Sequence, residues 1–204
     1  MYRHYNYNDY TNSFAIYHSW LQDFELHRYN SYRREEEKIR YCIRHGVLRE
    51  ELSLLCGIEA FEVKFNTNKS GRLFLSNQTD DTTKLYFSLA TSHDQFALLI
   101  TPEIHSGIDI EKINYLSYRE VNSIAAFFNP KEQAYFQSIG ESSYLNAFYK
   151  IWTGKECLIK SGIPDVWKST IIPVDDTIVN TTNFSFHWQI AETEYMMCVA
   201  TKHI

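Results

Sequence analysis

The sequence predicts an α+β fold, because two kinds of hydrophobic pattern occur in separate stretches of the chain. Apolar residues recur at helical spacing through residues 12–55, and short apolar or alternating segments typical of strands follow up to residue 111. From residue 117 onward, helical spacing comes first again and strand-like segments return near the end. This order of helices and then strands, met twice, favours α+β organisation over alternating βαβ units.

In the first half, the apolar stripe of residues 12–55 predicts helical structure that ends at Gly57, since glycine commonly terminates helices. Alternation at Phe61, Val63 and Phe65 predicts a half-buried strand. A polar turn cluster follows at 66–71. Two further strands are expected at 85–89 and 96–100, with a bend at 91–94 between them.

In the second half, residues 117–129 predict a helix, and Asn129-Pro130 resembles the start of the next one, because proline is favoured at the first helical position. A longer helix is expected over 143–161, stopping near Gly162. The strands expected here lie at 108–111, 184–188 and 195–200.

An internal likeness suggests how the halves are related. Gln95–Thr101 can be laid over Glu194–Ala200, and each segment follows a strand and a polar bend. We therefore expect one unit, 1–204, whose halves (about 1–105 and 106–204) pack as a pseudo-dimer. The alternative is a chance likeness between two apolar strands.

Composition limits the classes of function. The net charge of −5 argues against nucleic-acid binding by the whole chain. No apolar run approaches the roughly 20 residues of a membrane-spanning helix, and the first residues lack the apolar stretch of a signal peptide. The four cysteines show no metal-type spacing. These features predict a cytoplasmic protein with reduced thiols and no membrane or nucleic-acid partner.

The segment Gly107-Ile108-Asp109-Ile110-Glu111 places two carboxylates on one face of a strand, because residues two apart share a face. Like charges this close repel unless a cation lies between them, and Mg²⁺ accepts carboxylate oxygens together with substrate phosphates. The alternative is an exposed edge strand with solvated acids.

The segment Trp152–Lys160 adds a carboxylate and two lysines. Trp152, Glu156 and Lys160 share one helix face, and Lys155 is offset by about 100°. Glu156 could complete a metal shell, with the lysines near a phosphate. The alternative is an ordinary Glu–Lys surface pair.

Two more residues have simple alternatives to a functional role. Glu132 lies in the first turn of its helix, where an acid compensates the helix dipole. His93 lies in a bend, where a histidine can bind an anion or be ordinary polar surface.

Together, Gly107–Glu111, Phe127-Phe128-Asn129-Pro130-Lys131-Glu132 and Trp152–Lys160 resemble three motifs of the 4′-phosphopantetheinyl transferases, in the family's order. Those motifs are Gly-[Ile/Val]-Asp-x-Glu, Phe-[Phe/Ala]-x-x-x-Glu and Trp-x-x-Lys-Glu-[Ala/Ser]-x-x-Lys. The resemblance is to the larger, single-chain type associated with surfactin synthetase, and it is strong over residues 107–160.

The resemblance implies two similar α+β halves with the active site in the cleft between them. It also implies Mg²⁺-dependent transfer of the 4′-phosphopantetheine arm of coenzyme A to a serine of an apo acyl or peptidyl carrier protein, with 3′,5′-ADP as the other product. Two halves in one chain would form the cleft without a second copy, so a monomer is expected.

By matched position, the resemblance assigns roles to single residues. Asp109, Glu111 and Glu156 would bind Mg²⁺, and Glu132 would be the general base on the incoming serine. Glu156 and Lys160 complete the predicted catalytic set, and Lys155 and Lys160 would contact coenzyme A phosphates. The remaining coenzyme A ligands are expected to be Arg72, Ser92 and His93.

The chain departs from the family pattern in the coenzyme A half of the site. Gly71-Arg72-Leu73 stands where Gly-Lys-Pro is frequent, although arginine keeps the positive charge. Ser88–His93 stands where Asn-x-Ser-His-Ser is common. Either Thr91 replaces the histidine, or the bend is shifted and Ser92-His93 takes its part. Cys157 replaces a small Ala or Ser.

Two alternatives to an active transferase stay open. The altered hairpin motif suggests a catalytically inactive coenzyme A- or carrier-binding homologue, and the acids and lysines alone would also suit an unrelated Mg²⁺-dependent phosphohydrolase. The sequence does not identify the carrier. Basic residues that could meet an acidic carrier or coenzyme A, or form only a solvated helix face, are Arg33, Arg34, Lys38, Arg40 and Arg44.

Overall fold

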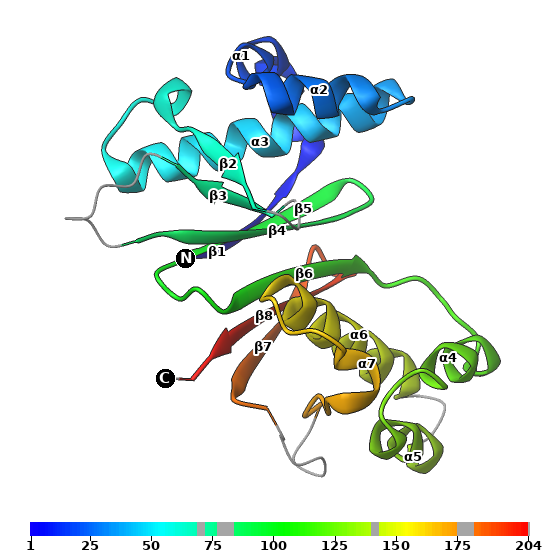
Figure 1. Ribbon diagram of the computed structural model, residues 1–204. Helices are drawn as coiled ribbons and strands as arrows, with labels where there is room; N and C mark the ends of the chain where they lie inside the picture. Colours follow the sequence, from blue (N-terminus) through cyan, green and yellow to red (C-terminus); the bar gives the residue numbers. More distant parts are fainter. Residues whose placement is uncertain (69–71, 77–83, 140–142, 175–181, 204) are drawn as a thin grey trace.

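The computed structural model describes residues 1–203 apart from 69–71, 77–83, 140–142 and 175–181. The predicted mixture of helices and strands is confirmed (Figure 1). The helices are α1 (Phe14–Ser19), α2 (Asp23–Ser31), α3 (Glu35–Cys56), α4 (Tyr118–Ala125), α5 (Pro130–Ser138), α6 (Tyr144–Lys160) and α7 (Val166–Ser169), with 3-10 helices η1 (Tyr7–Ser13) and η2 (Ala60–Glu62). The strands are β1 (Tyr2–Asn6), β2 (Phe65–Thr67), β3 (Leu73–Leu75), β4 (Tyr86–Ser92), β5 (Gln95–Thr101), β6 (Ser106–Lys112), β7 (Phe184–Ala191) and β8 (Tyr195–Lys202).

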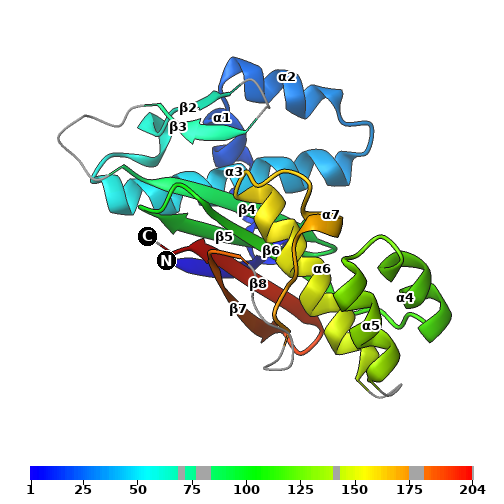
Figure 2. The ribbon, with the colours of Figure 1, turned by 60° about the horizontal axis from the view of Figure 1, so that its bottom comes forward.

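Two three-stranded antiparallel sheets form the centre of the molecule. The first has the strand order β1-β5-β4 and the second has the order β6-β8-β7, while β2 and β3 form a separate hairpin. Helix α3 covers one face of the first sheet, where Leu48 and Leu52 pack with Leu98 and Ile100. Helix α6 covers the second sheet in the same way, and α4 and α5 lie beside its N-terminal part (Figure 2).

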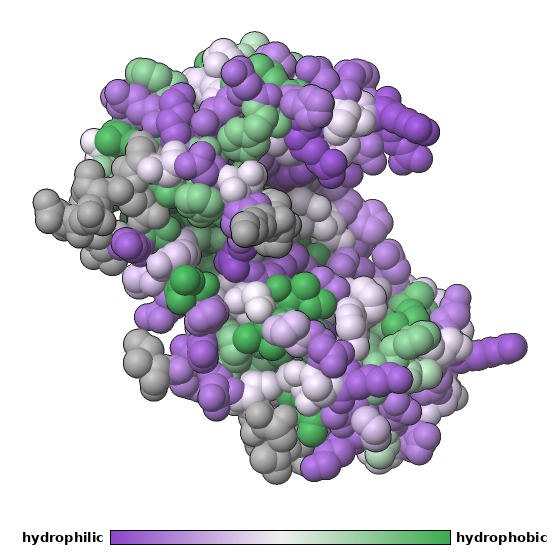
Figure 3. Space-filling model, viewed as in Figure 1, coloured by the Kyte–Doolittle hydropathy of each residue, from purple (hydrophilic) through white to green (hydrophobic). Residues whose placement is uncertain are grey.

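The uncovered faces of the two sheets pack against each other. Their shared core contains Ala97 and Leu99 from β5 and Ile108, Ile110 and Val199 from the second sheet. The edge strands β4 and β6 also meet, because hydroxyl groups on β4 accept hydrogen bonds from backbone N–H groups of β6. On the right of Figure 3 the surface is hollowed between the part built on α2 and α3 and the part built on α4 and α6.

The first half shows both agreement with the sequence predictions and departure from them. The segment 12–55 is helical as predicted and is divided into α1, α2 and α3, and Gly57 ends the last of them in a left-handed conformation (φ 67°), as predicted. The predicted strand through Phe61 and Val63 is wrong, because a capping box formed by Glu59 and Glu62 closes a 3-10 turn there. Strand β1 was not predicted. Part of the 66–71 turn cluster lies outside the described residues.

The other predicted elements agree with the structure within a few residues, whereas η1, β3 and α7, like β1, were not predicted. Strands β4 to β8 and helices α4, α5 and α6 all occur where the patterns placed them. Asn129 caps α5, and its side chain accepts a hydrogen bond from Lys131 N. Among the described residues, no helix is both long enough and apolar enough to cross a bilayer.

Candidate active site

The site is built where strand β6 crosses helix α6 at backbone contact. A Cβ atom added at Gly107 would lie 2.0 Å from the carbonyl oxygen of Cys157, so only glycine permits this approach. Ile108 and Ile110 point into the core between the sheets. The alternate residues Asp109 and Glu111 therefore face α6, as the two-residue period of a strand requires.

Asp109 is the buried centre of the cluster. Its Oδ1 accepts a hydrogen bond from Lys160 Nζ at 2.6 Å, and its Oδ2 is buried without a hydrogen-bond partner among the described residues. Burial, with smaller contributions from the nearby Glu111 and Glu156, raises the pKa of Asp109 to about 7 against the opposing effect of Lys160. Burial also raises the pKa of Glu156. The cluster thus holds more negative charge than Lys160 neutralises.

Glu111 connects the acids to the tip of the β4–β5 hairpin. Ser92 Oγ donates to Glu111 Oε2 at 3.0 Å, and Trp152 Nε1 donates to Glu111 Oε1 at 3.3 Å. Ser92 Oγ also lies 3.4 Å from His93 Nδ1. Thr91 is exposed on the opposite face of the strand. Of the two alternatives for this hairpin, the geometry places Ser92-His93, not Thr91, beside the acids.

A cavity of about 530 Å³ opens next to the acidic cluster. Arg72 and Lys160 both line it, so two cations from distant parts of the sequence face one space. Its other lining residues are Leu73, Phe87, Ser88, Leu89, Ile159 and Gly162. Burial lowers the pKa of Arg72, but an arginine stays charged at any physiological pH.

The three acids are near one another without being arranged as a finished cation site. Among the described residues, no three His, Cys, Asp or Glu side chains are grouped closely enough to hold a metal ion as they stand. The chemistry of the group nevertheless fits a hard divalent cation. Asp109 Oδ2 is a buried oxygen without a donor, and the pKa values of Asp109 and Glu156 are raised by excess negative charge as well as by burial.

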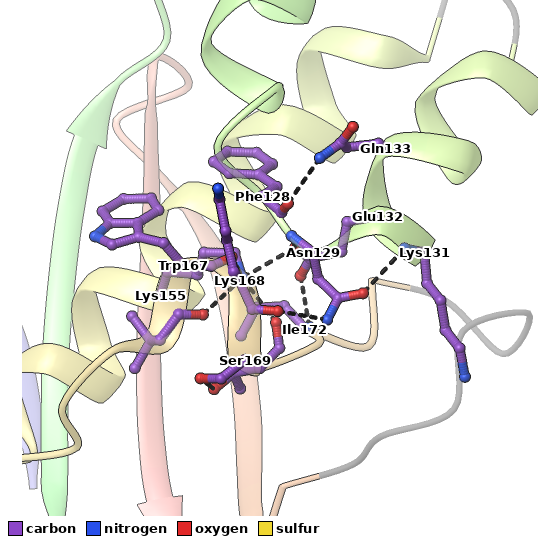
Figure 4. Close-up of polar contacts among 12 residues, drawn as sticks. Phe128, Asn129, Lys131, Glu132, Gln133, Lys155, Trp167, Lys168, Ser169 and Ile172 are labelled. Atoms are coloured by element: carbon purple, nitrogen blue, oxygen red, sulfur yellow. Dashed lines mark hydrogen bonds and ion pairs between the residues drawn. The ribbon is translucent and has the colours of Figure 1, made fainter.

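The other two predicted residues, Glu132 and Lys155, are brought to each other and not to this surface (Figure 4). Lys155 Nζ lies 2.9 Å from Glu132 Oε2, and both side chains are fully buried. The lysine also donates to the carbonyl oxygens of Val166, Trp167 and Thr170 at 2.9–3.1 Å. This placement does not support a contact of Lys155 with coenzyme A, because its donors are already used inside the protein.

Glu132 is equally enclosed. Its Oε1 accepts from Ile172 N at 2.8 Å, and its Oε2 accepts from Asn129 N at 3.1 Å as well as from Lys155. Burial raises the pKa of Glu132 and lowers that of Lys155. However, every partner of the lysine is an acceptor and every partner of the carboxylate is a donor, so the contacts favour an ionised pair. The predicted role of Glu132 as general base would require this pair to open.

Sequence reasoning missed two contributions to the site. Ser88 accepts a hydrogen bond from Ile108 N at 3.3 Å and helps to hold β6 in place. The spacing of Ser88 and Ser92, four residues apart on one strand face, could have indicated this. The segment 166–172, which is the short helix α7 followed by irregular chain, surrounds Lys155 and carries no comparable signal.

Comparisons with known proteins find similarity over the part of the chain that contains the acidic cluster. Residues 106–200 match the model of the 4′-phosphopantetheinyl transferase superfamily. The chain is 28% identical over 142 residues to the 4′-phosphopantetheinyl transferase HetI of Nostoc sp.. The aligned part covers 69% of this chain and 59% of that protein. The chain is 32% identical over 120 residues to AcpT of Escherichia coli O157:H7, another 4′-phosphopantetheinyl transferase (58% of this chain, 59% of that protein).

A third relative is the 4′-phosphopantetheinyl transferase gsp of Aneurinibacillus migulanus, 25% identical over 129 residues, with 63% of this chain and 48% of that protein covered. The chain thus spans less than two thirds of the length of these relatives. The family match covers β6 and α6, the elements that build the acidic cluster. Through this segment, just under half of its length, the chain is similar to the 4′-phosphopantetheinyl transferase superfamily.

Proposed function

We propose that the chain transfers the 4′-phosphopantetheine moiety of coenzyme A to a serine of an apo acyl or peptidyl carrier protein and releases 3′,5′-ADP. One observation carries this proposal: Asp109, Glu111, Glu156 and Lys160 converge beside a cavity that Arg72 also lines. Acids suited to a divalent cation and cations suited to phosphate therefore adjoin the same space. The names of the relatives support the same reaction.

The coenzyme A half of the proposal uses the cavity side. Arg72 and Lys160 would bind phosphate oxygens, because both are cations at its wall. Ser92 and His93 would contact the nucleotide end from the hairpin tip, where His93 is exposed and held in a left-handed conformation (φ 52°). Lys155 is not included, since its ammonium group is enclosed.

Asp109, Glu111 and Glu156 would hold Mg²⁺. When bound, the ion would neutralise charge on the diphosphate and stabilise the charge that develops on its bridging oxygen. The protein's own contribution is to keep three acids close despite their repulsion. It does so through Lys160 on Asp109, and through Ser92 and Trp152 on Glu111.

In the proposed reaction, the serine oxygen forms a bond to the β-phosphorus of coenzyme A while the bond from that phosphorus to the oxygen of 3′,5′-ADP breaks. The serine proton must move to a base. Glu156 suits this step better than Glu132, because Glu156 is partly exposed at the cluster and could accept the proton on an oxygen that does not hold Mg²⁺. A positioned base of this kind contributes about 10²–10⁴-fold.

We also infer that the two sheet-and-helix halves are a pseudo-dimer with the site in the cleft between them. The support is that a three-stranded antiparallel sheet occurs in each half, and that a long helix, α3 or α6, covers it. The proposal keeps a monomer as the acting unit and the cytoplasm as its compartment.

The direct test incubates the purified chain with coenzyme A, Mg²⁺ and several apo carrier proteins, and measures the intact mass of each carrier. We expect a gain of one phosphopantetheine on the serine of at least one carrier, with stoichiometric 3′,5′-ADP. Omitting the carrier should abolish 3′,5′-ADP release, which separates transfer from hydrolysis. Binding of coenzyme A without modification of any carrier would contradict the proposal and favour an inactive homologue.

A further inference from the structure

The buried pair Glu132–Lys155 joins three segments that are separate in the sequence. Lys155 projects from α6, and Glu132 lies in the first turn of α5. The lysine donates to carbonyl groups of residues 166–170, and the carboxylate accepts from the N–H group of Ile172 (Figure 4). Asn129 adds a side-chain hydrogen bond to Lys168 O at 2.7 Å. Hence α5, α6 and the segment 166–172 share one buried polar centre.

These segments form the wall of an apolar pocket of about 540 Å³. Phe128, which precedes α5, stacks on Trp167 with ring centres 5.9 Å apart, and Trp167 lies 5.1 Å from Trp152. The pocket is lined by Ser123, Ile124, Phe127, Phe128, Trp152, Asp165, Trp167 and Lys168. The aromatic residues Phe128 and Trp167 of this pocket therefore belong to the segments that the Glu132–Lys155 pair joins.

The same wall touches the acidic cluster through one residue. Trp152 lines the apolar pocket on one side, and its indole N–H donates to Glu111 Oε1. A shift of Trp167 would change the packing of Trp152 and with it the hydrogen bond on Glu111. Three contacts, Lys155 with Trp167, Trp167 with Trp152 and Trp152 with Glu111, thus lead from the buried pair to a proposed metal ligand.

We propose that Glu132 and Lys155 are positioning residues, a buried clasp that seats Trp167 and Trp152 and thereby orients Glu111. The inference rests on the proposed function for its kinetic part. It replaces the roles of base and coenzyme A ligand that the sequence resemblance implies for the two residues. Both residues act through the aromatic wall and not on the reacting atoms.

The two roles differ in how they respond to removal of both charges. Losing one member of a buried ion pair leaves an uncompensated charge and destabilises the fold strongly, whereas replacing both by neutral groups of similar size is often tolerated. A general base is different, because its loss cannot be repaired by removing a lysine. The double substitution therefore separates a clasp from a catalytic pair.

The experiment compares Glu132→Gln, Lys155→Met and the double variant, with Glu120→Gln as control. Glu120 occupies the same helix position in α4, but its capping box is exposed and has no lysine. Thermal unfolding, the emission of Trp152 and Trp167 (with Trp20 and Trp188 replaced by Phe) and the pH profile of kcat are measured. The pH profile of kcat is measured with a carrier protein that the wild type modifies.

We expect each single variant to unfold about 6–15 °C below the wild type and to show altered tryptophan emission. The double variant should recover at least half of that shift, the wild-type emission, a kcat within about tenfold of the wild type and an unchanged pH profile. The control should stay within about 4 °C of the wild type.

A double variant that is as stable as the wild type but slower by about 10²–10⁴-fold would overturn the clasp in favour of a catalytic base. A double variant no more stable than the single ones would overturn it as well. If the wild type modifies no carrier, the proposed function fails, while unfolding and emission still decide whether the clasp exists.

Discussion

Lys155 and Glu156 are neighbours in the sequence but belong to two clusters of opposite character. The first side chain enters the pair with Glu132, where the lysine meets only acceptors and the carboxylate only donors. The second faces Asp109, which has a buried oxygen without a donor and a pKa raised to about 7. A step of about 100° around one helix separates a closed cluster from an open one.

The difference between the two clusters shows how charged residues that stabilise the fold can be distinguished from charged residues that are suited to bind a ligand. A closed cluster balances its charge and uses its hydrogen-bonding groups internally. An open cluster keeps excess charge of one sign, and its pKa values are shifted accordingly. The first half supplies another largely closed case, because Glu25 is buried between His45 and Arg49.

The largest expected effect comes from breaking the Glu25 cluster. Glu25→Gln leaves the fully buried Arg49 without its counterion, and we expect a loss of about 3–5 kcal/mol in the free energy of unfolding. Urea denaturation measures it, with Glu36→Gln as control, whose exposed pair with Arg40 should cost less than about 1 kcal/mol. Equal losses in the two variants would contradict the description of Glu25 as part of a structural cluster.

The opposite pattern is expected in the open cluster. Asp109→Asn should reduce the transfer rate on the order of 10²–10³-fold, because it removes a proposed cation ligand and electrostatic support. The free energy of unfolding should not fall, since the change relieves repulsion with Glu111 and Glu156. Carrier modification by mass spectrometry and urea denaturation test the two parts. A rate within about tenfold of the wild type would count against the site.

Acid should weaken the Glu25 cluster in a defined window. Although burial raises the pKa of Glu25, hydrogen bonds from His45 and Arg49 outweigh it and lower the value to about 2 from the ordinary 4.5. Because the folded-state pKa is depressed, the stabilisation is complete above about pH 4.5 and is lost as the pH falls toward 2. It amounts to about 3 kcal/mol.

His45 extends the pH range over which acid destabilises this cluster to higher pH values. Burial lowers its pKa from 6.5 to about 4, so its neutral form favours the fold and the contribution is lost as the pH falls from 6.5 toward 4. Measured between pH 4.5 and 2, the unfolding free energy of the wild type should decline more steeply than that of Glu25→Gln, because only the wild type loses the Glu25 contribution there. Parallel curves would refute the assignment.

Gly107→Ala should damage both fold and site, because the new methyl group meets the backbone of α6. We expect about 1–3 kcal/mol of destabilisation and a lower transfer rate in the protein that remains folded. Gly57→Ala is the matched control. It has open space but a positive φ, so it should cost about 1 kcal/mol without changing the rate. Equal rates in the two variants would exclude the close approach as a cause.

The smallest effect is expected for Ser92→Ala, which removes a hydrogen bond to Glu111 that is partly exposed. A loss of about 1 kcal/mol corresponds to a KM for coenzyme A raised about fivefold, with kcat nearly unchanged. Steady-state kinetics with Thr91→Val as control would check this. A larger effect for Thr91 would reverse the assignment of the hairpin.

The sequence was a good guide where the local pattern and the tertiary structure agree. The pattern of β6 predicted that Asp109 and Glu111 share a face, and Asn129-Pro130 predicted the start of α5 correctly. It failed at Phe61 and Val63, whose alternation resembles a strand while a capping box holds them in a 3-10 turn. Short alternations lack the length needed to distinguish the two.

The site shows the same limit. The motif Trp152–Lys160 identified residues that converge on β6. It could not show that Lys155 forms an ion pair with Glu132 and donates hydrogen bonds to carbonyl groups of residues 166–170. That outcome depends on the path of residues 166–172, where the short helix α7 and the residues after it are too few to give a periodic pattern. Likewise, the shifted hairpin could be resolved only once β4 and β6 were placed side by side.

The contrast between open and closed clusters is tested most directly by calorimetric titration of Mg²⁺ in the presence of coenzyme A. Three proteins are compared, namely the wild type, Asp109→Asn and the double variant Glu132→Gln/Lys155→Met. We predict similar Mg²⁺ affinity for the wild type and the double variant, and a loss of at least about tenfold for Asp109→Asn. Binding that is unaffected by Asp109→Asn, or lost in a folded double variant, would contradict the account.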